Sequence, residues 1–249
     1  MENKKTEVDI ILPNYNSSKY IDATIKSIIK QTFKNWKLII IDDSSDIRTK
    51  EKIIKYEKLN KIKVYWMKKN RGAAYCRNLG INKSKSKFLA FIDSDDIWEK
   101  NKLKLQIQYM KKNNYVFTYT SYRTFGLRYG KVNPPLKFNF ENFIKNTSIA
   151  TSTMMVKRNT IKGIRFTNTK ICEDYFFKCK ILKKVEIAHC IKKYLTRYRI
   201  RKNSLQSSKF KNLYWIWKIN KKFNKLNFSE NLISLLSISI NSIKKYGFK

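Results

Sequence analysis

The sequence predicts an α/β protein with a mainly parallel central sheet, flanking helices and a C-terminal helical extension. Three short apolar runs indicate strands buried on both faces of a sheet: Val8–Leu12, Leu38–Ile41 and Phe88–Ile92. The stretches Ser18–Thr32 and Ile47–Leu59 separate these runs and carry apolar residues at helical spacing. Because parallel strands need long crossover connections, this alternation predicts a sheet in which the three strands lie parallel.

Polar clusters follow each of the three predicted strands. A Pro13–Asn16 turn follows the first, Asp42 and Asp43 follow the second, and an Asp93–Asp96 cluster follows the third. Ligands of open α/β sheets bind beyond the carboxyl ends of the strands, so these segments should converge. In a chain with 55 basic and only 18 acidic residues, this concentration of acid predicts a site for a metal and a phosphorylated ligand.

The length of 249 residues and the apolar content of 42% allow a substantial core. We expect one domain over residues 6–205, with a ligand-binding half (8–98) and a second half (99–205), followed by a basic amphipathic extension (206–249). The net charge of +37 predicts attraction to an anionic membrane surface. A general bias toward Lys, Asn and Ile is the open alternative.

The N-terminus and the cysteines predict a reducing compartment. No secretory signal precedes the first strand, and no apolar run approaches the roughly 18 residues of a membrane span. The protein is therefore expected in the cytoplasm, peripherally at the inner face of the membrane. Cys76, Cys172, Cys179 and Cys190 are scattered, which indicates core thiols instead of disulfides or a zinc site. The lone histidine, His189, is expected to be structural.

Four motifs in the first half resemble those of the family 2 glycosyltransferases, inverting enzymes of the GT-A fold that use nucleotide diphosphate sugars. They are Leu12–Asn16, Ile41–Ser45, Asn70–Asn78 and Ile92–Asp96, in the family's order and spacing. In the second half, only Glu173-Asp174 and Tyr198-Arg199 followed by Asn203-Ser204 carry the resemblance. The resemblance implies a GT-A, Rossmann-like sheet and transfer of a sugar to a glycan or lipid-linked acceptor.

The resemblance places the nucleotide beside the first two strand ends. Pro13, Tyr15 and Asn16 would border it, and Asp43, with Asp42 beside it, would accept a hydrogen bond from the imide N–H of a uracil-type base. A UDP-type donor is therefore expected. The alternative is that Asp42 and Asp43 only begin the following helix.

The Asn70–Asn78 loop opens a helix and predicts a phosphate site. Gly72 permits close approach of the backbone to a ligand, and free N–H groups at a helix N-terminus attract anions. Arg71 and Arg77 would hold the diphosphate region. An internal ion pair between Arg77 and Asp43 or Asp93 is the alternative, which would leave Arg77 an indirect role.

The Asp93–Asp96 cluster is a DXD-type element that predicts a divalent cation, Mg²⁺ or Mn²⁺. We expect Asp95 to bind the metal directly and Asp93 to bind it through water or to bind the ribose. Asp96 either assists or caps a helix that Trp98 and Glu99 begin.

Inverting transfer also needs a base that removes the proton of the acceptor hydroxyl. By resemblance this base is Asp174, with Glu173 structural or facing the acceptor. The alternative is that both acids complement the dipole of the helix they begin. Where many relatives carry a histidine after Tyr-Arg, this chain has Arg201 and Lys202, which leaves the third metal ligand open and predicts weaker metal dependence.

The extension contains two predicted helices, Phe210–Lys225 and Leu232–Ile243, that are basic or amphipathic. They would lie on a membrane or, equally, pack on the domain or on a partner subunit. Three rival functions are an inactive GT-A relative that acts as a scaffold, a nucleic-acid-binding protein and a sugar-phosphate nucleotidyltransferase. The intact acid clusters argue against an inactive scaffold. No nucleic-acid motif is present, which argues against the second function. A nucleotidyltransferase should carry a Gly-rich loop after the first strand, and this chain has none there.

Overall fold

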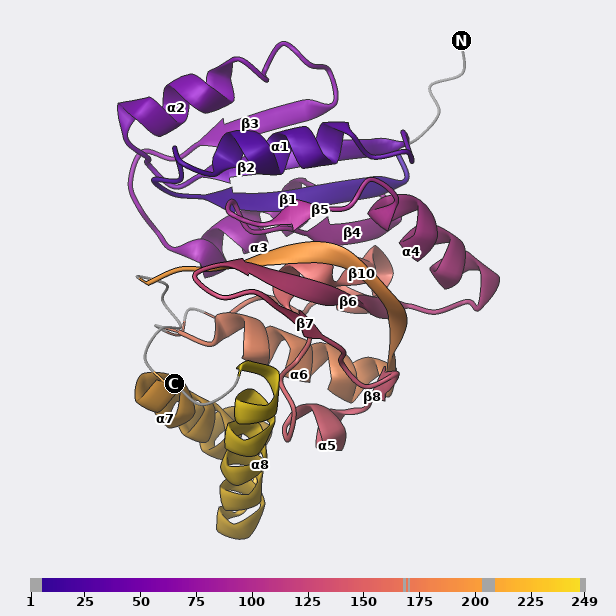
Figure 1. The fold of residues 1–249 in the computed structure, drawn as a ribbon, viewed down its shortest axis with the longest axis vertical. Coiled ribbons are helices and arrows are strands. Elements are labelled where there is room, and N and C mark those ends of the chain that lie inside the picture. Colours follow the sequence, from indigo (N-terminus) through magenta and orange to yellow (C-terminus); the bar gives the residue numbers. More distant parts are fainter. Residues whose placement is uncertain (1–5, 168, 170, 203–208, 247–249) are drawn as a thin grey trace.

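A ten-stranded sheet forms the centre of the computed structural model, which describes residues 6–167, 169, 171–202 and 209–246. The order across the sheet is β3 (Ile62–Trp66), β2 (Trp36–Asp42), β1 (Val8–Asn14), β4 (Phe88–Phe91), β9 (Met155–Lys157), β6 (Phe117–Gly126), β10 (Ala188–Ile200) and β5 (Ile97–Trp98). In addition, β7 (Gly130–Val132) pairs with β6, and β8 (Lys137–Phe138) pairs with β10. Helices cover both faces (Figure 1), which confirms the predicted fold class.

One short antiparallel strand joins two parallel parts of the sheet, and β5, β7 and β8 add antiparallel pairs beside the second part. β1 is parallel to β2 and β4, and β2 is parallel to β3. β10 is parallel to β6. Between these parts, β9 runs antiparallel to both β4 and β6. The three apolar runs of the sequence are the cores of β1, β2 and β4, as predicted.

Each face of the sheet packs on its own set of helices. The helices on the first face are α1 (Ile21–Ile29), α2 (Ile47–Ile54) and α4 (Lys102–Lys112), and those on the second are α3 (Ala73–Lys83), α5 (Phe140–Phe143) and α6 (Glu173–Val185). Successive side chains of a strand point to opposite faces, so Ile10 and Leu12 join the first core and Ile11 the second. Gly80 lets α3 approach β1, because a Cβ there would lie 2.5 Å from Ile11 Cγ2.

The segment after Asp96 differs from the sequence prediction, in which Trp98 and Glu99 begin a helix. Ile97 and Trp98 form β5 instead, antiparallel to β10. The indole Nε1 of Trp98 donates a hydrogen bond to the backbone carbonyl of Ser152 at 2.8 Å. The helix α4 begins only at Lys102. Long-range pairing of Trp98 with the sheet therefore outweighs its local tendency to start a helix.

The C-terminal extension consists of α7 (Lys209–Ile219), the π-helical turn η3 (Asn220–Asn224) and α8 (Phe228–Tyr246). These helices lie next to α5 and α6, on the side of the molecule away from β3 (Figure 1). The predicted domain boundary at 205 and the Asn203-Ser204 motif fall outside the described residues, so the boundary stays a prediction. In the described part of the chain, no helix has both the length and the apolarity that a membrane crossing requires.

The buried amide of Asn220 fastens the extension to α6. Its Oδ1 accepts a hydrogen bond from the Tyr175 hydroxyl at 2.6 Å, and its Nδ2 donates to Asn231 Oδ1 at 3.1 Å and to Ser234 Oγ at 3.0 Å. The hydroxyl of Ser234 in turn donates to the carbonyl of Ile144 at 2.6 Å. One polar cluster therefore joins α6, α8 and the segment after α5.

Replacement of this amide should destabilise the protein. We expect Asn220→Ala to lower the free energy of unfolding by about 3 kcal/mol, because several buried polar groups each lose a partner. Chemical denaturation followed by circular dichroism measures the change. Asn159→Ala, at an exposed asparagine, is the matched control. Equal stabilities of the two variants would show that the amide cluster does not hold the extension.

Candidate active site

The ends of β1 and β2 bring their polar side chains together. Asn14 and Asp42 are register partners, and Asn14 Nδ2 donates a hydrogen bond to Asp42 Oδ1 at 2.7 Å. The other carboxylate oxygen of Asp42 accepts from the backbone N–H of Ser45 at 3.0 Å. The alternative that Asp42 and Asp43 begin the next helix is wrong, because the side chain of Asp46 caps α2. Asp42 instead holds the turn after β2.

Asp43 fastens the loop that opens α3. Its two carboxylate oxygens accept the backbone N–H groups of Arg71, at 2.8 Å, and Gly72, at 2.7 Å. Gly72 has a φ of 85°, a conformation that favours glycine. A carboxylate offers about four lone-pair positions, so Asp43 retains capacity to accept a further hydrogen bond from a ligand. Asp43, predicted to contact the nucleotide base, therefore touches the Asn70–Asn78 loop, predicted to bind phosphate.

The remaining residues predicted for the nucleotide divide into exposed and structural groups. The ring of Tyr15 is exposed at the strand end, and the Arg71 guanidinium lies 3.8 Å from the centre of the Tyr75 ring. Pro13 is buried within β1. Asn16 Oδ1 accepts a backbone N–H before α2 at 2.8 Å. Tyr15 and Arg71 are therefore available to a ligand, whereas Pro13 and Asn16 shape the backbone.

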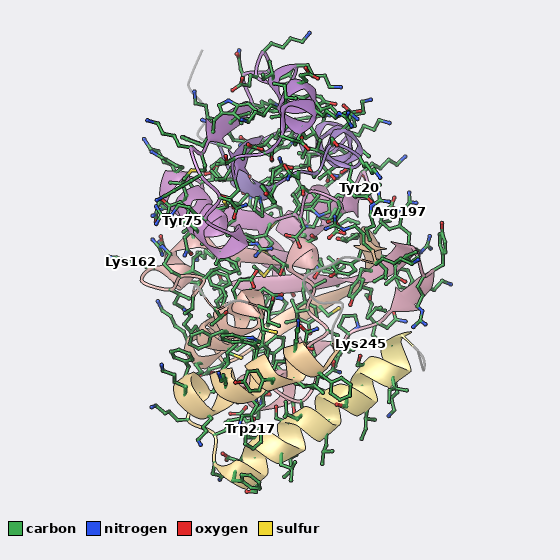
Figure 2. The ribbon with its side chains drawn as sticks, turned by 90° about the vertical axis from the view of Figure 1, so that its left-hand side faces the viewer. Tyr20, Tyr75, Lys162, Arg197, Trp217 and Lys245 are labelled. Carbon is green, nitrogen blue, oxygen red and sulfur yellow. The ribbon has the colours of Figure 1, made fainter. Side chains whose placement is uncertain are left out.

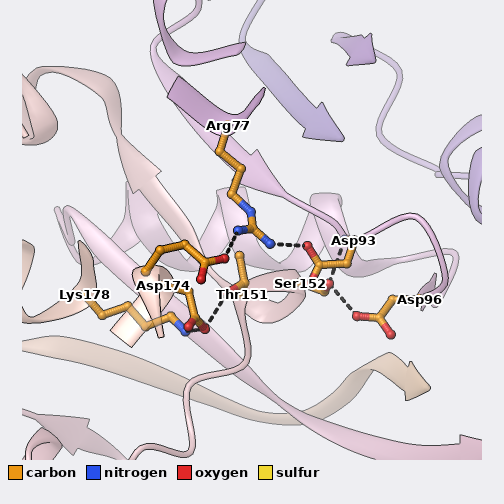
Figure 3. Close-up of polar contacts among 8 residues, drawn as sticks. Arg77, Asp93, Asp96, Thr151, Ser152, Asp174 and Lys178 are labelled. Carbon is orange, nitrogen blue, oxygen red and sulfur yellow. Dashed lines mark hydrogen bonds and ion pairs between the residues drawn. The ribbon is translucent and has the colours of Figure 1, made fainter. Parts of the chain in front are cut away.

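Arg77 is buried on α3 between two carboxylates (Figure 3). Its Nη2 lies 2.7 Å from Asp93 Oδ1, and its Nη1 lies 2.8 Å from Glu173 Oε1. Burial alone would lower the pKa of Arg77, but the two carboxylates raise it above its ordinary value. Of the predicted alternative ion pairs, the one with Asp93 is present, and Glu173 is a partner that the sequence did not suggest. Asp93 follows β4 and Glu173 begins α6, so one guanidinium joins the two halves of the domain.

Asp174 lies beside the Arg77–Glu173 ion pair, and Lys178 of the same helix, α6, contacts its carboxylate (Figure 3). Its Oδ2 accepts hydrogen bonds from Lys178 Nζ at 2.7 Å and from Thr151 Oγ1 at 3.1 Å. Burial would raise the pKa of Asp174, but Lys178, Arg77 and Thr151 together lower it to about 2. The carboxylate is therefore ionised at neutral pH.

Asp96 is a structural member of the acid cluster. Its Oδ2 accepts from Ser152 Oγ at 2.5 Å and its Oδ1 from the backbone N–H of Arg199 at 2.8 Å. Burial, with Asp95 and Asp93 nearby, raises the pKa of Asp96 well above its ordinary value. The predicted capping role is wrong, since α4 begins six residues later at Lys102. Asp96 instead connects β10 to the short helix η1 (Thr151–Thr153).

Asp95, the predicted metal ligand, is buried and forms an ion pair with Arg201. The distance from Asp95 Oδ2 to Arg201 Nε is 2.7 Å. Burial raises the pKa of Asp95, Asp93 adds to this effect, and Arg201 opposes it. Two carboxylates that repel each other offer the oxygen ligands that Mg²⁺ or Mn²⁺ prefers, so the residues fit a divalent cation once Arg201 leaves Asp95. Three such ligands do not gather anywhere in the described part of the chain, and donor phosphates and water would supply the others.

A small cavity of about 100 Å³ opens between these groups. The charged residues that line it are Arg77, Asp93, Glu173 and Asp174, with Tyr122, Thr151 and Tyr198 among the polar ones. It therefore presents an ionised carboxylate, a buried guanidinium and hydroxyl groups to a small polar ligand. His189 lies at the other end of β10, with its ring stacked on Tyr115 at 3.5 Å between centroids.

Sequence reasoning missed Lys178, Thr151 and Ser152. Lys178 follows Asp174 by four residues on a predicted helix, and this spacing is a known ion-pair signal. Thr151 and Ser152 lie in a segment without charge or periodicity, and long-range contacts with Trp98 and Asp96 place it. No local signal in the sequence points to them.

Comparison with known proteins gives one family. The model for "Glycosyl transferase family 2" matches residues 9–176. The Escherichia coli protein named UDP-Glc:alpha-D-GlcNAc-diphosphoundecaprenol beta-1,3-glucosyltransferase WfgD is 34% identical over 244 residues, which cover 97% of this chain and 95% of that protein. The matched region contains every acid cluster described above.

Solved structures show the same fold. Residues 1–349 of S. aureus TarS, in complex with UDP-GlcNAc, superpose with a TM-score of 0.75 at 20% identity over 96% of this chain and 73% of that one. The mannosyltransferase PcManGT from Pyrobaculum calidifontis, in complex with GDP-Man and Mn2+, gives 0.71 at 13% identity over 94% and 69%. Both neighbours have the GT-A fold that the sequence motifs predict. With the family match over residues 9–176, the chain belongs to glycosyl transferase family 2 and is a nucleotide-sugar-dependent glycosyltransferase.

Proposed function

We propose that this enzyme transfers a sugar, with inversion, from a UDP-type donor to a hydroxyl of a lipid-linked or polysaccharide acceptor. The observation that carries the proposal is the cavity in which the ionised carboxylate of Asp174 lies beside the Arg77–Asp93 ion pair. The exposed Tyr15 ring and the Asp43 loop clamp supply a nucleotide site at the adjacent strand ends. The name of WfgD specifies UDP-Glc and a diphosphoundecaprenol-linked acceptor. This supports both the UDP-type donor and the lipid-linked acceptor of the proposal.

The reaction is a single displacement. The acceptor oxygen forms a bond to the anomeric carbon on one face of the sugar, while the bond from that carbon to the β-phosphate oxygen breaks on the other face. The hydroxyl proton passes to Asp174, and the electron pair of the broken bond leaves with the nucleoside diphosphate. A pKa near 2 makes Asp174 a weak base, which suits a proton that is lost only as the new C–O bond makes the hydroxyl acidic.

A divalent cation on Asp95, with Asp93 nearby, would neutralise charge on the departing diphosphate. Arg201, which pairs with Asp95 in the absence of a cation, would be available to a phosphate oxygen if a cation took its place on Asp95. The protein would act in the cytoplasm, peripherally at the inner face of the membrane, where a lipid-linked acceptor is exposed.

The first test is thermal stability against a panel of nucleoside diphosphates and nucleotide sugars, with and without Mn²⁺. A ligand that binds the native state raises the melting temperature. A shift with uridine nucleotides that grows with Mn²⁺ supports the proposed donor. A shift with guanosine nucleotides alone would replace the donor, and no shift with any nucleotide would favour a scaffold.

Substitution of the two assigned carboxylates should separate donor binding from transfer. Asp95→Ala is expected to abolish donor binding at low metal, because the metal loses its direct ligand. Asp174→Asn should bind donor normally and transfer sugar about 10²–10⁴-fold more slowly, the usual contribution of a general base. Calorimetry measures the first effect and nucleotide release the second. Glu141→Gln, at an exposed acid on α5, controls for charge. Wild-type transfer rates in both variants would refute the assignment.

Lys178 should control the pH at which Asp174 works. A pKa lowered to about 2 keeps Asp174 ionised, so transfer in the wild type should persist until acid unfolds the protein. Burial raises the pKa of Asp174, and Lys178 is the largest influence that lowers it. In Lys178→Met only Arg77 and Thr151 still lower this pKa. The acid limb of kcat/KM should then move up by roughly 1–2 pH units.

The control for this shift is Lys184→Met, which removes an exposed lysine from the same helix. Both variants are compared with the wild type across the acid range in which all three remain folded by circular dichroism. An unmoved acid limb in Lys178→Met would mean that another group accepts the proton.

A further inference from the structure

A second, larger cavity of about 620 Å³ lies between the catalytic half and the C-terminal helices. It is lined by Asp174 and Lys178 of α6, by Leu127 and Arg128 of the β6–β7 turn, and by residues of α7 and α8. Lys245 lies at the end of α8 nearest the sheet, whereas Trp217 lies at the opposite end of the extension (Figure 2). The cavity reaches Asp174, so its occupant can meet the proposed base. Its volume is typical of sites for small ligands.

One part of the wall is apolar. It is formed by the side chains Phe143, Leu213, Ile216, Ile238 and Ile243. The first belongs to α5, the next two to α7 and the last two to α8. An acceptor made only of sugar would leave this wall in contact with hydroxyl groups. The wall instead fits the start of a hydrocarbon chain.

The other part of the wall is cationic. The basic residues that line the cavity are Arg128, Lys178, Arg199, Arg201, Lys202 and Lys245. Among the described lining residues Asp174 is the one acid, and Lys178 already pairs with it. Arg201 pairs with Asp95, which does not line the cavity, so Arg128, Lys202 and Lys245, together with Arg199, are the lining cations for which the described residues show no ion pair.

Lys245 is the clearest sign of a missing anion. It is half-buried at the cavity, and no carboxylate within the described residues forms an ion pair with it. Burial, with Lys178 nearby, lowers the pKa of Lys245 to about 8. Keeping this half-buried ammonium without a carboxylate partner costs free energy that an anionic ligand would recover.

We propose that this cavity binds the diphosphate and the first lipid units of a lipid diphosphate-linked acceptor, with Lys245 on the diphosphate. This assignment rests on the proposed function and specifies how the acceptor is held. The apolar wall receives the beginning of the chain, and the sugar beyond the diphosphate extends toward Asp174. The rest of a long chain leaves along the outer face of α8, where Leu236 and Ile240 are 56% and 54% exposed.

Binding of farnesyl diphosphate, a soluble lipid diphosphate, tests the site without turnover. Calorimetry is done with EDTA present, so that no metal draws the diphosphate to the donor site. We expect Lys245→Gln to weaken binding about tenfold or more, the cost of a lost charged hydrogen bond. Lys244→Gln removes the same charge from the exposed neighbouring position and should bind as the wild type does. Ser242→Phe, which fills the cavity without removing a charge, should also weaken binding.

Two further probes separate the sources of affinity. Inorganic diphosphate should bind more weakly than farnesyl diphosphate because it leaves the apolar wall empty, and farnesol should bind more weakly because it leaves Lys245 unpaired. If inorganic diphosphate binds equally well, the lipid part of the inference is wrong. If farnesol binds equally well, the diphosphate part is wrong.

The outcome for this site is distinguishable from that of the proposed function. Equal binding by Lys245→Gln and Lys244→Gln, in a protein that still transfers sugar, would overturn the acceptor site and leave the reaction standing. Lys245-dependent binding in a protein that transfers no sugar from any nucleotide would overturn the reaction and leave the lipid diphosphate site standing. In an active enzyme, Lys245→Gln should raise KM for a lipid diphosphate-linked acceptor about tenfold or more, with the affinity for donor unchanged.

Discussion

The buried guanidinium of Arg77 is the interaction on which the site depends. A buried cation is costly unless partners on every side compensate it, and here one partner follows β4 while the other begins α6. The ion pairs therefore join the half that contains β1 to β4 to the half that carries Asp174. All three members of these ion pairs, Arg77, Asp93 and Glu173, line the small cavity.

Cations neutralise the acids of the site before any ligand arrives. Asp93 pairs with Arg77, Asp95 with Arg201 and Asp174 with Lys178. A metal bound to a diphosphate carries both positive and negative charge. If it displaced the Asp95–Arg201 ion pair, the metal would pair with Asp95 and the diphosphate with Arg201. A net charge of +37 gives the protein ample cations for such an exchange, and screening by salt limits those at the surface more than those inside.

The sequence predicted the parts of the fold that depend on local patterns. Continuous apolar runs gave β1, β2 and β4, and the motifs at their ends located Asp42, Asp43, Asp93 and Asp95. Features that depend on distant partners were missed or wrong: Trp98 joins the sheet because β10 is there to pair with it, and Ser152 reaches the site through Trp98 and Asp96. The Arg77–Glu173 pair spans 96 positions, a separation at which neither spacing nor periodicity carries information.

The position of β9 in the sheet has a consequence for how the chain is made. β4 and β6 are neighbours in space only through this three-residue strand, which the ribosome releases after both. If β1 to β4 pair before β9 is made, the β4 side of their sheet is an open edge with unpaired backbone groups. Such edges can pair with strands of other chains, so a nascent chain that has not yet reached residue 157 carries an edge that is open to aggregation.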